Sequence, residues 1–118
     1  MNIEQFRKYC LDKKGVTESF PFDEETLVFK VMGKMFALAS LEKNPVTANL
    51  KCNPERAILL RENHENAISE GYHMSKIHWN TIELEGIPEK LLIELIEHSY
   101  ELVVSKLTKI VREELANL

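Results

Sequence analysis

Two histidines, a lysine and the only tryptophan of the chain lie within ten residues, over 72–81, and this segment holds no acidic residue. Imidazole and ammonium groups can bind an anion such as phosphate, and aromatic rings can stack on nucleic-acid bases. His73, Lys76 and His78 are therefore candidate ligand-binding side chains. The same segment is also compatible with a polar loop that one large side chain, Trp79, holds against a sheet.

A second region, residues 26–51, carries four lysines against one glutamate, whereas the whole chain has a net charge of −4. The acids thus lie mainly on expected helices and the lysines on expected strands. This asymmetry can steer an anion to one face, or the lysines can simply protect strand edges from pairing with other chains. Lys34, at an expected hairpin tip, and Lys51, at an expected strand end, are the candidate phosphate contacts. Neither region contains an arginine, the better bidentate donor to phosphate.

Metal binding and catalysis find little support in the spacing of residues. His73 and His78 are five residues apart, a spacing that fits neither one helical face nor one strand face. The chain has no phosphate-binding glycine loop, no His-Glu-x-x-His motif and no Gly-x-Ser-x-Gly motif. We therefore expect no catalytic residue, no metal and no cofactor, in a protein that is not an enzyme.

The length of 118 residues predicts a single domain, 1–118, with room for a real core. No apolar run is long enough to span a membrane, and the N-terminus lacks the pattern of a secretory signal. We expect a cytoplasmic monomer with no membrane partner. Cys10 and Cys52 are expected to be buried thiols rather than a disulfide. Alternatively, Cys52 has a lowered pKa, because it precedes an expected helix.

The hydrophobic pattern predicts an α+β fold in which an antiparallel sheet of four or more strands has helices packed on one face. Segments 17–23 and 65–76 are expected to be irregular, with Phe20 and Phe22 against the core and Trp79 largely buried. The last helix is expected to break near 98–100. The expected helices are 2–14, 53–63 and from 88 onward, and the expected strands are 26–31, 34–39, 46–51 and 79–84.

Six short blocks follow one another between residues 17 and 107. They are Glu18-Ser-Phe-Pro-Phe-Asp23, Val28-Phe-Lys-Val31 with Gly33-Lys-Met-Phe-Ala-Leu38, Asn49-Leu-Lys-Cys-Asn-Pro-Glu55, Gly71-Tyr-His-Met-Ser-Lys76, His78-Trp-Asn-Thr81 and Ser99-Tyr-Glu-Leu-Val103. This series resembles the MmcQ/YjbR family of small bacterial proteins. Two positions depart from the family pattern: Glu70 replaces a proline or small residue, and Thr108 with the tail after it replaces a proline and a basic ending.

The resemblance implies a frataxin-like fold, with an antiparallel sheet and helices on one side of it. It also implies weak DNA binding through a double-wing arrangement. The alternative is a non-enzymatic module that binds a protein partner and has no nucleic-acid role. The residues expected to contact nucleic acid are Lys34, Lys51, His73, Lys76 and His78.

Overall fold

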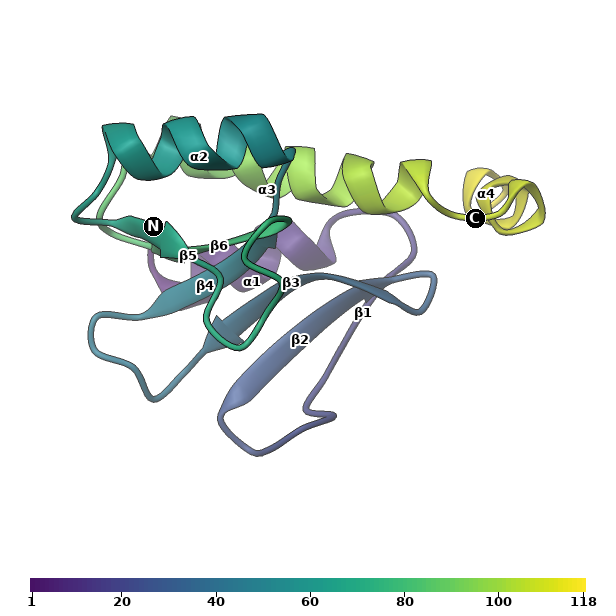
Figure 1. Cartoon of the computed structure of the whole chain (residues 1–118). Helices are drawn as coiled ribbons and strands as arrows, with labels where there is room; N and C mark the ends of the chain where they lie inside the picture. The colour runs from purple at the N-terminus through teal and green to yellow at the C-terminus, as the bar shows by residue number, and fades with distance from the viewer.

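A computed structural model describes all residues, 1–118. The chain forms four helices and six strands (Figure 1), in the order α1 (Ile3–Leu11), β1 (Val16–Ser19), β2 (Thr26–Val31), β3 (Lys34–Ser40), β4 (Thr47–Lys51), α2 (Pro54–Asn63), β5 (Ile68–Glu70), β6 (Trp79–Glu83), α3 (Glu89–Ser105) and α4 (Lys109–Ala116). The strands make one sheet in the order β1-β2-β3-β4-β6-β5, and every neighbouring pair is antiparallel. The predicted α+β fold is confirmed.

The β2–β3 hairpin follows from its residues. β2 is rich in β-branched and large apolar side chains and β3 in large apolar ones, which pack well on a pleated surface. The turn residues Met32 and Gly33 both have positive φ, 49° and 84°. Two successive positive φ values give the turn a twist that matches the right-handed twist of the strands.

Alternation along the strands divides the sheet into two different faces. The helix-covered face carries Leu27, Phe29 and Val31 of β2, as predicted, and these side chains join the main core. All four helices contribute side chains to this core, including Phe6 of α1, Ala57 of α2, Leu92 of α3 and Leu115 of α4. The helices therefore cover one face of the sheet and leave the other open. No helix is both long and apolar enough to cross a membrane.

The helix-free face has a small apolar cluster of its own. Val28, Leu38 and Trp79 are buried there, and the half-buried Met35 and Met74 pack against them. Trp79 is 8% exposed, which confirms that it is largely buried. It starts β6 and lies opposite Lys51 of β4 in the strand register.

Two strands form in segments that we expected to be irregular. Val16–Ser19 pairs with β2 as edge strand β1, and Ile68–Glu70 pairs with β6 as edge strand β5. Both are only three or four residues long, so cross-strand hydrogen bonding rather than local preference decides their structure. The prediction that Phe20 and Phe22 pack against the core is wrong. They lie in the loop after β1 and are 47% and 65% exposed.

The expected break in the last helix near His98–Tyr100 is also wrong. The α3 helix continues to Ser105, and a new helix begins after Thr108, whose side chain accepts a hydrogen bond from the Val111 amide. Ser99 is buried and continues the helix, because its hydroxyl donates to the Phe36 carbonyl and accepts from the Lys51 amide. The first helix ends at Leu11, three residues earlier than expected.

Candidate functional site

The loop between β5 and β6 folds back across the helix-free face of the sheet. The Tyr72 amide donates to Thr81 Oγ1 at 2.9 Å, and the Asn49 side-chain amide donates to the Tyr72 carbonyl at 3.2 Å. Thr81 Oγ1 in turn donates to Asn49 Oδ1 at 2.5 Å. Side chains of β4 and β6 thus hold the backbone of the loop at Tyr72.

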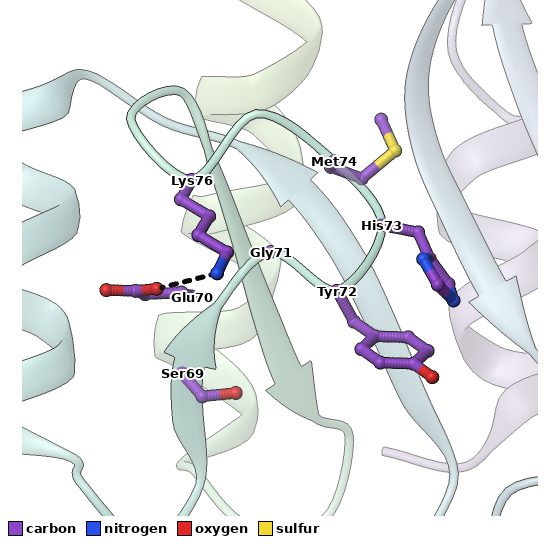
Figure 2. Close-up of a pocket in the computed structure, with 7 residues that line it drawn as sticks. All are labelled: Ser69, Glu70, Gly71, Tyr72, His73, Met74 and Lys76. Atoms are coloured by element: carbon purple, nitrogen blue, oxygen red, sulfur yellow. Dashed lines mark ion pairs between the residues drawn. The ribbon is translucent and has the colours of Figure 1, made fainter.

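Two residues of this loop have unusual backbone requirements. Gly71 lies so close to β6 that an added Cβ would be 2.7 Å from Trp79 Cβ and 2.9 Å from its carbonyl oxygen. His73 has φ of 58°, a left-handed backbone conformation that is uncommon for residues other than glycine. The His73 ring lies 4.0 Å from the Tyr72 ring, centroid to centroid. Figure 2 shows both rings on the same side of the loop.

A groove of about 450 Å³ lies between this loop and the open sheet face. We call it the sheet groove. Its floor consists of strand residues from β2, β3, β4 and β6, and its walls come from the loops after β1, β3 and β5. Its volume is within the range of about 300–1000 Å³ that is usual for small-molecule sites. The lining residues are Phe22, Asp23, Glu25, Thr26, Leu38, Ser40, Glu42, Lys43, Thr47, Asn49, Tyr72, His73, Met74 and Thr81.

The charges of the sheet groove are mixed, with acids in excess. Asp23 accepts hydrogen bonds from the amides of Glu25 and Thr26, which hold the pKa of its carboxyl below the usual range. The Lys43 ammonium lies 4.4 Å from the centre of the Tyr72 ring. Tyr72 itself is 58% exposed, so part of its surface remains open to a ligand.

The structure places the three candidate side chains of residues 72–81, His73, Lys76 and His78, at different positions around the loop. His73 lines the sheet groove, but Lys76 does not. Lys76 forms an ion pair with Glu70 at 3.7 Å across a shallower hollow of about 570 Å³, which His73 and Tyr72 also border (Figure 2). His78 lines neither cavity and is exposed.

The turn that precedes β6 keeps His78 away from both cavities. The Trp79 amide donates to the Ser75 carbonyl, and the Cys52 amide donates to the His78 carbonyl at 2.8 Å. These hydrogen bonds fix the end of the loop beside the last residues of β4, whereas Tyr72 and His73 lie farther along the face. Of the three candidates, His73 and Lys76 therefore border a common hollow, and His78 lies apart from both cavities.

Lys34 and Lys51 lie at one end of the sheet, away from the groove. Lys34 begins β3 at the hairpin and is exposed, while Lys51 ends the antiparallel neighbour β4 and is half-buried. Lys30 of β2 lies at the same end, because β2 leads into that hairpin. None of these three lysines forms an ion pair. They make a basic sheet end, which we define as Lys30, Lys34 and Lys51.

Sequence reasoning missed most of the sheet groove. Phe22, Glu25, Glu42 and Lys43 come from two different loops, and only the sheet brings these loops beside Tyr72. One signal was present in the sequence. Phe22 and Asp23 follow Pro21 in a segment without periodicity, where an aromatic residue without a strand to hold it can remain exposed.

Burial makes the thiols of Cys10 and Cys52 unreactive. Cys10 and Cys52 are both buried and free, as expected. Burial raises the pKa of Cys10 to about 12 and also raises that of Cys52, so the alternative of a lowered pKa at Cys52 is wrong. No cluster of three or more histidine, cysteine, aspartate or glutamate side chains is arranged to hold a metal ion.

These features define a class of small α+β proteins, in which helices cover one face of an antiparallel sheet and a loop crosses the other. The model of the YjbR family matches residues 11–102. The chain belongs to this family, and the predicted resemblance to MmcQ/YjbR proteins is confirmed.

Relatives of the chain cover nearly its whole length. It is 32% identical to the uncharacterized protein YjbR of Escherichia coli K12 over 119 residues, with both chains fully covered. It is 37% identical to the uncharacterized protein YbdF of Escherichia coli O157:H7, over 90% of this chain and 87% of that one. The crystal structure of Deinococcus radiodurans protein DR2400 matches with a TM-score of 0.91 and 43% identity, over 98% of this chain and 88% of that one.

Proposed function

We propose that this protein is a non-enzymatic binding protein whose ligand occupies the sheet groove. The observation that carries the proposal is the position of the loop after β5. Two side-chain hydrogen bonds hold this loop at Tyr72 above an open sheet face, and a third joins the two side chains that make them, so that the loop walls a groove instead of filling it. Such a preformed, concave and partly apolar space with a few polar groups is the usual form of a ligand site.

Binding without catalysis is supported by the chemistry of the groove. Its hydroxyl groups, on Thr26, Ser40, Thr47, Tyr72 and Thr81, make no hydrogen bond with His73, the one imidazole of the lining. Both thiols lie outside the lining and have raised pKa values. We expect the protein to work in the cytoplasm as a monomer. Size-exclusion chromatography with light scattering would test the monomeric state.

A thermal-shift screen of small organic compounds tests the proposal. A groove ligand raises the melting temperature of the wild type and fails to do so for Tyr72→Ala, because Tyr72 forms one wall. Ile58→Ala is the matched control, since Ile58 is an exposed apolar residue of α2 that is remote from the groove. Compounds that stabilise all three proteins equally would contradict the proposal and favour the protein-interaction alternative.

Weak nucleic-acid binding is the second candidate, and the basic sheet end favours it. Lys34 and Lys51 are free of ion pairs and lie at the same end of the adjacent strands β3 and β4, where each could contact a phosphate. The structure leaves little for bases to stack on at this end, because Trp79 is buried. The sequence candidates Lys76 and His73 are less suited to phosphate, since Glu70 pairs with Lys76 and the groove beside His73 has an excess of acids.

Fluorescence anisotropy with a labelled oligonucleotide tests this second candidate. Phosphate contacts predict binding that weakens steeply as salt increases and that Lys34→Glu or Lys51→Glu reduces. Lys90→Glu, at an exposed lysine near the start of α3, is the control. Binding that is absent at low salt, or equal in all variants, would remove the nucleic-acid role.

A further inference from the structure

The carboxylates that line the sheet groove are not all needed by the fold. Asp23 holds the turn into β2 through three hydrogen bonds, two from backbone amides and one from the Thr26 hydroxyl. Glu25 and Glu42 also line the groove, but the carboxylates of these two exposed side chains have no hydrogen-bond or ion-pair partner. Two acids are therefore free to meet a ligand, and three carboxylates face a single ammonium group, that of Lys43.

The position of Lys43 shows that the Tyr72 ring can hold a positively charged group. Its ammonium lies over the Tyr72 ring at 4.4 Å, within the range of about 6 Å for a cation–π contact. It forms no ion pair with Glu42, its sequence neighbour, nor with any other carboxylate. The face of Tyr72 is thus already used as a cation-binding surface by the chain itself.

We propose that the sheet groove binds a small organic cation, whose ammonium or guanidinium group replaces Lys43 over the Tyr72 ring. This inference rests on the proposed function and adds the class of ligand. The free carboxylates of Glu25 and Glu42 balance the positive charge, and the apolar body of the ligand lies against Phe22 and Met74.

Anions are poor candidates for the same groove. An anionic group would meet three carboxylates and would gain one ammonium, Lys43, only by drawing it away from Tyr72. Like charges that share a site repel each other, and the lowered pKa of Asp23 keeps that carboxyl ionised near neutral pH. The basic sheet end lies elsewhere on the sheet and does not offset this repulsion.

Three matched aromatic probes separate the classes of ligand by isothermal titration calorimetry on the full chain. They are benzyltrimethylammonium, benzyl alcohol and benzoate, which share a ring and differ in charge. We expect binding in the order cation, neutral, anion. Equal or tighter binding of benzoate or benzyl alcohol at a Tyr72-dependent site would overturn the cation inference and leave the groove as a binding site. Failure of all three probes to bind would overturn it as well, whereas the thermal-shift screen decides the proposed function separately.

Substitution of Lys43 gives the sharpest test, because it predicts a gain of affinity. Lys43→Gln frees the Tyr72 ring and removes a like charge, so benzyltrimethylammonium should bind about 2- to 5-fold more tightly. Lys90→Gln, which removes an equal charge from an exposed site on α3, should change binding little. Weaker binding by Lys43→Gln would contradict the proposal, since that result means Lys43 helps to hold the ligand.

Variants of the wall and the acids complete the test. Tyr72→Ala should weaken binding about 2- to 30-fold, the range of cation–π energies expressed as an affinity ratio, while Tyr72→Phe keeps the ring and restores it. Glu25→Gln with Glu42→Gln should weaken binding of the cation and leave that of benzyl alcohol unchanged. Tyr72, Glu25, Glu42 and Lys43 are all exposed and lie outside the main core, so these substitutions should leave the protein folded.

Discussion

Replacement of Trp79 by alanine should destabilise the protein by about 3–4 kcal/mol. The side chain is 8% exposed, so nearly all of the roughly 150–250 Å² that a large aromatic buries is lost. At about 25 cal/mol per Å² this amounts to about 4–6 kcal/mol. The cluster around Trp79 lies under a loop that can settle into part of the cavity. We therefore expect a value toward the lower part of the range of about 3–5 kcal/mol measured for such truncations.

Urea denaturation followed by circular dichroism measures this change, because Trp79→Ala removes the only intrinsic tryptophan signal. Tyr72→Ala, in the loop that precedes β6, is the matched control, and the 58% exposure of Tyr72 predicts a change of about 0.5 kcal/mol or less. Equal destabilisation by the two variants would refute the assignment of Trp79 to a buried cluster. An emission maximum of the wild type at the wavelength of fully solvated indole would refute it independently.

Three further predictions concern the rest of the molecule. Neither thiol should react with a disulfide reagent at pH 8 in the folded state, because burial raises the pKa of Cys10 to about 12 and also raises that of Cys52; rapid reaction before unfolding would contradict this. Burial, with the nearby Arg56, lowers the pKa of His98, and its Nε2 accepts a hydrogen bond from the Asn53 amide. As pH falls below about 6.5, His98 is therefore protonated in the unfolded chain before it is protonated in the folded protein. Stability should thus decrease as pH falls through the lowered pKa, and His98→Gln should lose that part of the slope in pH-dependent urea titrations. Gly71→Ala should cost about 1–3 kcal/mol, because the new Cβ would meet the Trp79 backbone and Cβ; an unchanged urea midpoint would contradict the close approach.

Much of the fold could be predicted from local patterns. The β2–β3 hairpin, β4, β6 and α2 carry strong signals: alternating apolar residues, Gly33 at a positive φ, and Asn53 with Pro54 at the helix start. The edge strands β1 and β5 could not be predicted, since they are short and become strands only through hydrogen bonds to β2 and β6. The continuity of α3 through Ser99 likewise depends on distant partners, the Phe36 carbonyl and the Lys51 amide.

The candidate site was located only in part. The sequence singled out residues 72–81 as a candidate site, and four members of that segment, Tyr72, His73, Met74 and Thr81, line the sheet groove. The pairing of Lys76 with Glu70 and the separation of His78 depend on how the loop folds back, which spacing alone does not determine. Glu25, Glu42 and Lys43 belong to loops at the ends of other strands, so their presence in the groove follows from the order of strands in the sheet.

Mapping of backbone amide shifts by nuclear magnetic resonance tests the central claim, that the helix-free face holds the binding site. Benzyltrimethylammonium is titrated into the ¹⁵N-labelled wild type, with the Tyr72→Ala variant as control. We predict that the largest shifts occur in the sheet groove, at Thr26, Ser40 and Tyr72, and that they disappear in the variant. Shifts centred on α2 and α3, or on the basic sheet end, would contradict the claim.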